Sequence, residues 1–353
     1  MNLKRPRLQA CVILAMAASL CGCATLPLIP SGRTPEPVLA EVKEYYSYNP
    51  LPLKATFSPM SPEPSSRWIA QHVTLEVEGQ TLPIQMDWYA PPHAQKAPVV
   101  LIFPILWGND LGVKDFAQGF AREGIHGIIV YRPKEKFSME KPLSQIEEHF
   151  HATVVNARRV IDWLETQPNV DTSKIGSLGI SMGATLNVVV AVAEPRIQRY
   201  VFCLPASHMA EVIITTRDHS ISKKRDEYLK RYRMSQKEAQ AQLETLFKSE
   251  PLRVAHSIDP KKSMMVIAMW DRVIGRKNSI AIWRALGKPR ALWIPTGHYT
   301  ALFALPYVKM KVLWFFQDWS SSGKRLDRNE RTADRQPSFD PPLWPPTFRE
   351  KQK

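Results

Sequence analysis

One short segment of the chain has the pattern that turns a serine into a nucleophile. Residues Gly179-Ile-Ser-Met-Gly183 follow Gly-x-Ser-x-Gly, and the serine is Ser181. A buried-strand pattern precedes the segment and a helix rich in Ala and Val follows it, which is the strand–turn–helix setting that this motif requires. In such a tight turn, side chains at the flanking positions would collide with the adjacent strand and helix, so glycine is favoured there. We therefore expect Ser181 to attack a carbonyl carbon.

A serine nucleophile needs a base, and the base needs a carboxylate that orients it. In chains with this motif the partners follow in the order serine, acid, histidine. His298 lies in Pro295-Thr-Gly-His-Tyr299, directly after the last strand pattern, and Asp271 directly follows the preceding one. Asp259 is a nearby rival, but it precedes a proline and a strand, which favours a cap or turn. We predict a triad of Ser181, Asp271 and His298.

These residues need a scaffold that brings chain-distant strand ends together. From residue 97 onward, short apolar runs alternate with helical periodicity, a pattern typical of parallel strands joined by helices in one doubly wound sheet. Because ligand sites in such sheets lie at the carboxyl ends of the strands, the three candidate residues are expected at one edge. The expected strands are 72–77, 82–89, 99–103, 127–131, 175–180, 200–204, 264–269 and 291–294; the expected helices are 113–123, 143–166, 182–193, 277–286 and 299–319.

Residues 207–260 break this alternation. They carry dense charge and helical periodicity but no strand pattern. We interpret them as a helical insertion over the carboxyl edge of the sheet, a lid or cap, and the alternative is a peripheral helical excursion with no such role.

The stretch from Asn156 to Ala184 resembles the dienelactone hydrolase and acyl-peptidase branches of the α/β-hydrolase superfamily. In those branches a helix ending in Asp-Trp-Leu and an Asp-rich turn lead into the nucleophile. The resemblance covers about residues 95–320 and implies an α/β fold with a mostly parallel eight-stranded sheet, flanking helices and the Ser181–His298–Asp271 triad. Serine replaces the cysteine of dienelactone hydrolases proper, which argues against that particular activity.

The same resemblance directs attention to the oxyanion hole. One donor is expected to be the backbone N–H of Met182, next after the nucleophile. The second should come from the strand end Phe103-Pro-Ile-Leu-Trp-Gly-Asn109, which lacks the His-Gly found in many members. Ile105 is the first choice and Leu106 the second, and Pro104 is excluded because it has no N–H.

The N-terminus has the features of a bacterial lipoprotein signal. Three basic residues occur within the first seven positions, residues 8–20 form a short apolar stretch, and Leu20-Cys-Gly-Cys23 follows. This last segment resembles the lipobox, so we predict that residues 1–22 are a signal peptide and that Cys23 is lipidated. The protein is then exported to the cell envelope and anchored to a membrane. The alternatives are an ordinary cleaved signal peptide or an uncleaved anchor.

Composition sets the remaining limits. We predict a Pro-rich tether over 23–65, a hydrolase domain over 66–320 and a flexible, basic, Pro-rich tail over 321–353. The formal net charge of +14 is dispersed, and with no zinc spacing or RNA-recognition motif a nucleic-acid partner is not expected. Three of the four cysteines lie in the predicted signal region, and Cys203, within an apolar run, is expected to be buried and inert.

Together these features predict a serine hydrolase that cleaves an ester or thioester of a small-molecule or lipid-like acyl substrate through an acyl-enzyme, with no metal or cofactor. A peptidase or amidase with the same triad is an alternative, because pocket shape decides the leaving group. A non-catalytic binding protein that retains the fold is another.

Overall fold

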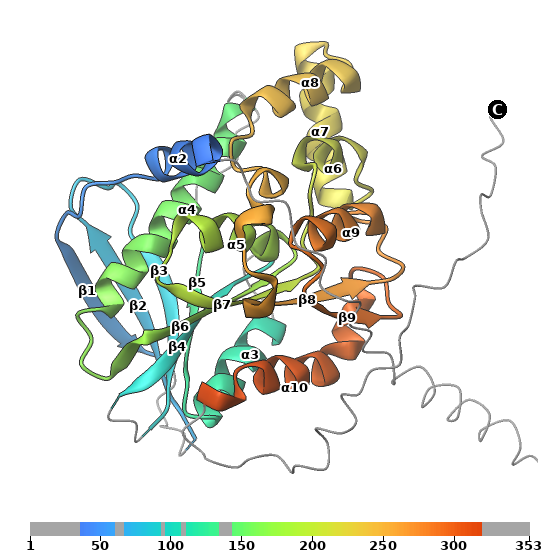
Figure 1. Cartoon of the computed structure of the whole chain (residues 1–353). Helices are drawn as coiled ribbons and strands as arrows, with labels where there is room; N and C mark the ends of the chain where they lie inside the picture. Colours follow the sequence, from blue (N-terminus) through green and yellow to red (C-terminus); the bar gives the residue numbers. More distant parts are fainter. Residues whose placement is uncertain (1–35, 61–66, 93–95, 107–110, 134–142, 320–353) are drawn as a thin grey trace, which may run out of the picture.

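A computed structural model describes residues 36–60, 67–92, 96–106, 111–133 and 143–319. The predicted signal peptide, Cys23 and the tail over 321–353 lie outside these residues. Within them, one nine-stranded sheet has the order β1-β2-β3-β5-β4-β6-β7-β8-β9 (Figure 1). Its strands are β1 (Leu53–Pro59), β2 (Ile69–Val77), β3 (Ile84–Ala90), β4 (Ala97–Phe103), β5 (His126–Val130), β6 (Val170–Ile180), β7 (Ile197–Cys203), β8 (Ser263–Ala268) and β9 (Arg290–Ile294).

The strands from β5 to the β9 edge all pair in parallel, whereas β1, β2 and β3 pair antiparallel. The predicted mostly parallel sheet is therefore confirmed. Every residue of β4 is buried, because helices cover both faces of this part of the sheet. Val99, Leu101 and Phe103 pack on one face, and Val100 and Ile102 on the other, as the alternation of a strand requires.

Helices lie on both faces of the sheet (Figure 1). One face packs against α2 (Glu36–Tyr45), α4 (Ser144–Leu164), α5 (Met182–Ala193) and α9 (Arg276–Ala285). The other face packs against α3 (Leu111–Arg122) and α10 (Leu305–Phe315). The helix predicted over 299–319 is in fact the short helix η4 (Thr300–Ala304) followed by α10, and Pro306 lies in the first turn of α10, where proline is tolerated.

We predicted a Pro-rich tether over 23–65 and a hydrolase domain that begins at residue 66. For the described residues 36–60 this prediction is wrong. Val42 of α2 and Tyr46 are buried in the core, and β1 pairs with β2 along its whole length. The prolines allow this because Pro37 lies in the first turn of α2 and Pro59 ends an edge strand. β1 is also why the sheet has nine strands where the resemblance implied eight.

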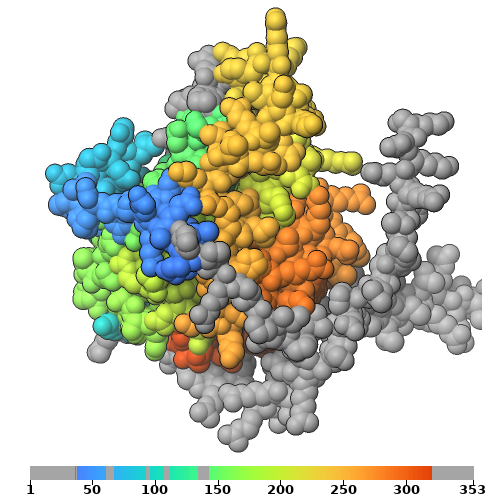
Figure 2. All heavy atoms as spheres, turned by 45° about the horizontal axis from the view of Figure 1, so that its top comes forward, coloured from blue at the N-terminus to red at the C-terminus, as the bar shows by residue number. Residues whose placement is uncertain are grey.

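The predicted helical insertion contains α6 (Met209–Thr215), α7 (His219–Tyr232) and α8 (Gln236–Leu246), and residues 207–260 contribute no strand. Short helical turns follow at η1 (Pro251–Arg253), η2 (Ala255–Ser257) and η3 (Pro260–Lys262). The yellow insertion protrudes from the surface in Figure 2, and the blue α2 lies against the segment after α8, where Arg253 forms an ion pair with Glu41 at 2.7 Å. That the insertion acts as a lid stays a prediction.

Candidate active site

Ser181 lies at a sharp turn between β6 and α5. Its backbone has φ 54° and ψ −118°, a conformation that residues with a side chain rarely adopt. A Cβ at Gly179 would lie 2.4 Å from the carbonyl oxygen of Gly183, and a Cβ at Gly183 would lie 2.1 Å from that of Phe103. Both glycines of the motif are thus required by close backbone approach, as we predicted from its spacing.

The side chains of Ser181, His298 and Asp271 form one hydrogen-bonded row. Ser181 Oγ lies 2.9 Å from His298 Nε2, and His298 Nδ1 lies 2.7 Å from Asp271 Oδ2. If His298 donates from Nδ1 to the carboxylate, Nε2 is left as an acceptor for the serine hydroxyl. The structure therefore brings together the three residues proposed from the sequence, although they are far apart in the chain.

The carboxylate of Asp271 is held from two sides. The residue is buried, and its Oδ1 accepts the backbone N–H groups of Val273 at 2.9 Å and Ile274 at 3.1 Å. These bonds fix the orientation of the carboxylate and leave Oδ2 directed at His298. Asp259, the rival, instead caps η3 by accepting the N–H of Lys261 at 2.8 Å, in agreement with the prediction that it serves a turn.

The predicted oxyanion donors come from the elbow itself and from a loop that packs against it. Met182 is the first residue of α5, so its N–H has no acceptor within the helix. The loop with Ile105 and Leu106 follows β4, and its start packs against Gly183. Both candidates for the second donor therefore remain, while residues 107–109 of the same predicted loop lie outside the described residues.

The sequence analysis did not identify Arg132, whose guanidinium group contacts the backbone of this loop. It donates to the carbonyl oxygens of Pro104 at 2.9 Å and Ile105 at 2.6 Å, and also to that of Leu106. The available signal was its position directly after the predicted strand 127–131, at the carboxyl edge where the other site residues also lie.

Three aromatic side chains close in sequence to Asp271 or His298 are exposed. Trp270 immediately precedes Asp271 and is 63% exposed, and Tyr299 immediately follows His298 and is 65% exposed. Phe303 of η4 is 85% exposed. The hydroxyl of Tyr299 donates to Asp218, the N-cap of α7, so the insertion contacts the loop that carries the histidine.

Other features of the described residues lie apart from this row. Cys203 is buried, which raises its thiol pKa to about 12 and makes it a poor nucleophile at neutral pH, as predicted.

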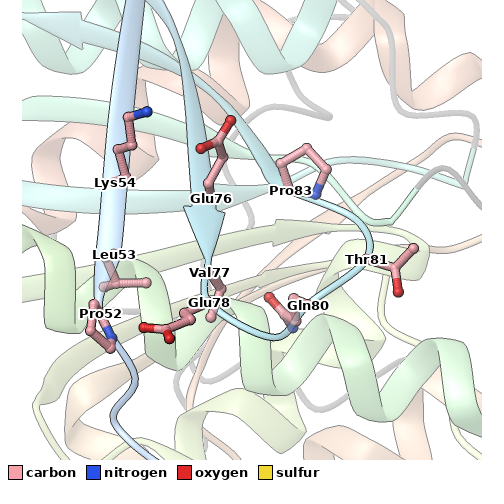
Figure 3. Close-up of a pocket in the computed structure, with 9 residues that line it drawn as sticks. All are labelled: Pro52, Leu53, Lys54, Glu76, Val77, Glu78, Gln80, Thr81 and Pro83. Carbon is pink, nitrogen blue, oxygen red and sulfur yellow. The ribbon is translucent and has the colours of Figure 1, made fainter.

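A surface groove opens at the ends of β1 and β2, lined among others by Lys54, Glu76 and Glu78 (Figure 3). Three strands separate β2 from β6, so the groove does not belong to the Ser181 site.

Within the described part of the chain, no cluster of His, Cys, Asp and Glu could hold a metal ion. Nor does any helix there combine the length and apolarity needed to cross a bilayer.

Residues 86–244 match the model of the dienelactone hydrolase family. No curated protein matches the chain. Among solved structures, an acetyl xylan esterase from Paenibacillus sp. R4 is similar at 15% identity and a TM-score of 0.66, over 85% of this chain and 98% of that one. Acetyl xylan esterase 1 from Thermoanaerobacterium sp. is similar at 15% identity and a TM-score of 0.61, over 81% and 96%.

A Pyrococcus horikoshii acylaminoacyl peptidase is similar at 14% identity and a TM-score of 0.56, over 75% of this chain and 44% of that one. At these low identities the structural similarity establishes the fold alone. The family match over 86–244 supports a carboxylic ester hydrolase. The chain has the α/β-hydrolase fold, and its central part is similar to the dienelactone hydrolases.

Proposed function

We propose that the protein cleaves a carboxylic ester or thioester by acyl transfer to Ser181. The observation that carries this proposal is the unbroken pair of hydrogen bonds from Asp271 through His298 to Ser181, at 2.7 and 2.9 Å. The hydroxyl lies at a strained elbow beside the first N–H groups of α5. A nucleophile, its base, the residue that orients the base and an anion-binding helix start are then all in one place.

In this mechanism Ser181 Oγ attacks the carbonyl carbon while His298 Nε2 takes the hydroxyl proton. Asp271 stabilises the imidazolium, and the N–H groups of Met182 and of Ile105 or Leu106 bind the oxyanion. His298 then gives the proton to the departing alkoxide or thiolate, which leaves an acyl-enzyme. Water, deprotonated by His298, attacks the acyl-enzyme, releases the carboxylic acid and restores the serine hydroxyl.

The substrate class follows from the surroundings of the row. Exposed Trp270, Tyr299 and Phe303 provide apolar contact area, which favours a small-molecule or lipid-like acyl ester over a highly charged one. Two of the similar solved structures are acetyl xylan esterases, whose name specifies an acetyl ester, so a short acyl group is the first to test.

A series of p-nitrophenyl esters of increasing acyl length tests the proposal directly. We expect turnover of at least one ester by the purified protein and none by Ser181→Ala. Faster turnover of a matched p-nitroanilide would favour the amidase alternative. Activity that falls steadily beyond acetate would contradict a lipid-directed role. Absence of turnover together with absence of fluorophosphonate labelling would favour a non-catalytic binding protein.

We further propose that the protein is exported and anchored through a lipid on Cys23. The basic start, the short apolar stretch and Leu20-Cys-Gly-Cys23 support this. Cells that express the full chain and are fed a labelled fatty acid should incorporate the label into the protein, and Cys23→Ser should abolish this. Equal labelling of the wild-type protein and of Cys23→Ser would contradict lipidation of Cys23.

A further inference from the structure

The guanidinium group of Arg132 binds three consecutive backbone carbonyls, those of Pro104, Ile105 and Leu106. These residues form the loop from which the second oxyanion donor is expected. Burial lowers the pKa of Arg132 only to about 10, so the group remains a cation at neutral pH. A planar fork of several N–H donors suits such a cluster of acceptors, and a lysine amine cannot reproduce it.

Each carbonyl that Arg132 binds fixes the direction of the next backbone N–H. A trans peptide unit is planar, so its C=O and N–H bonds point in opposite directions. No cis peptide occurs among the described residues. The bond to the Pro104 carbonyl therefore sets the direction of the Ile105 N–H, and the bond to the Ile105 carbonyl sets that of the Leu106 N–H. Both candidate donors are aimed away from Arg132.

The loop is fixed on a second side by the nucleophile helix. A methyl group at Gly183 would come within 2.1 Å of the Phe103 carbonyl oxygen and 2.6 Å of that of Pro104. The loop backbone is thus in direct contact with α5, two residues beyond Ser181, and Arg132 contacts it from the segment that follows β5. With Pro104 restricting φ at the start of the loop, little freedom is left for its peptide planes.

We propose that Arg132 is a positioning residue for the oxyanion hole, which holds the peptide units of residues 104–106 so that the N–H of Ile105 or Leu106 faces the reacting carbonyl. It also polarises these units, because a cation on the carbonyl oxygen makes the N–H of the same unit a stronger donor. In this role Arg132 acts on the reaction through the loop backbone that it binds. This inference rests on the proposed ester hydrolysis and adds how its transition state is stabilised.

The tests use Arg132→Lys and Arg132→Gln in the full chain. Removal of one oxyanion donor costs about a hundredfold or more in kcat, and a mispositioned donor should cost about tenfold to a hundredfold. We expect this loss in kcat on p-nitrophenyl acetate, with KM changed less than about threefold because the ground-state ester gains little from the hole. The pH–rate profile should keep its midpoints, since His298 and Asp271 are unaltered.

A trifluoromethyl ketone separates positioning from general destabilisation. It forms a tetrahedral adduct with a serine whose oxyanion needs the same donors, so its affinity should fall in proportion to kcat/KM. Arg159→Lys is the matched control. Arg159 is a buried arginine on α4 that donates to the carbonyl of Leu51 before β1, remote from the triad. The Arg159→Lys substitution should lower the melting temperature and leave kcat and ketone affinity unchanged.

A small molecule can also replace the missing side chain. Arg132→Ala should recover part of its kcat when methylguanidinium is added at a low concentration, and Arg159→Ala should not respond. Unchanged kcat and ketone affinity in Arg132→Lys and Arg132→Gln would overturn the role of Arg132 and leave the proposed ester hydrolysis unaffected. A wild-type protein that neither turns over the ester nor binds the ketone would overturn it together with the proposed function.

Discussion

Two histidine–aspartate pairs of nearly the same geometry lie in different halves of this sheet. His298 Nδ1 lies 2.7 Å from Asp271, and His72 Nδ1 lies 2.8 Å from Asp87. In the first pair the other ring nitrogen faces the hydroxyl of Ser181. In the second, Nε2 lies 2.6 Å from the side-chain oxygen of Gln85, and Asp87 also accepts the hydroxyl of Tyr131 at 2.7 Å.

The difference comes from where each residue lies on its strand. His72 and Asp87 are directly opposite each other within β2 and β3, so their contact is a cross-strand pair that stabilises the sheet. Asp271 and His298 follow β8 and β9, beyond the carboxyl ends of parallel strands. Of the two pairs, only His298–Asp271 has its other ring nitrogen facing a hydroxyl on a strained elbow, which is the geometry that the proposed mechanism requires.

Ser181→Ala should give the largest effect. Loss of the nucleophile in a serine triad lowers kcat by about a millionfold, to the level left by binding and the oxyanion hole. The change removes only a hydroxyl, so we expect the far-ultraviolet circular dichroism to be unchanged. Steady-state hydrolysis of the best p-nitrophenyl ester measures the loss, and activity within tenfold of wild type would contradict the assignment.

Asp271→Asn and Asp87→Asn test the two pairs with the same substitution. For Asp271 we expect kcat to fall about ten-thousandfold, because the amide favours the wrong histidine tautomer. For Asp87 we expect kcat to stay within about twofold of wild type, because no reacting group contacts that pair. An equal loss of activity in the two variants would contradict the different roles assigned to the two pairs.

The same Asp87→Asn variant should be less stable. Asp87 is buried and accepts from both His72 and Tyr131, so the substitution disturbs two hydrogen bonds of a buried carboxylate. We expect the free energy of unfolding to fall by about 1–3 kcal/mol. Urea denaturation measures it, and an unchanged midpoint would show that this pair contributes nothing to the sheet.

The smallest expected effect is the contribution of His126 to the pH dependence of the free energy of unfolding. Unlike the other two histidines, His126 hydrogen-bonds through its two ring nitrogens to groups other than carboxylates. It is fully buried, its Nδ1 accepts the indole N–H of Trp88 at 3.0 Å, and its Nε2 lies 2.9 Å from the carbonyl of Asn169. Burial lowers its pKa below the ordinary value of 6.5. Below pH 6.5 the unfolded chain therefore binds a proton that the folded chain does not, and stability falls as the pH falls, by at most about 1.4 kcal/mol per pH unit.

Urea denaturation at pH 7.5 and 5.5 checks this sign. His126→Asn should be less stable than wild type at pH 7.5, because the ring packing is lost, and should show a smaller further loss at pH 5.5. A pH dependence as steep as that of wild type would exclude His126 as a source of the acid sensitivity.

The sequence was informative where local pattern determines structure. The apolar run of β4 and the Gly-x-Ser-x-Gly elbow are local features, and strand order then placed Asp271 and His298 at the same edge. The density of prolines concealed α2 and β1, because composition does not reveal that those prolines occupy helix starts, loops and an edge strand. Arg132 and the His72–Asp87 pair depend on contacts between separate segments, which periodicity does not encode.

Labelling with a fluorophosphonate, followed by digestion and mass spectrometry, tests the central claim most directly. We expect one phosphonylated serine, on the peptide that contains Ser181, in the wild-type protein, and no adduct in Ser181→Ala. An adduct on another residue, or none on a folded wild-type protein, would contradict the claim that the hydroxyl of Ser181 is an activated nucleophile.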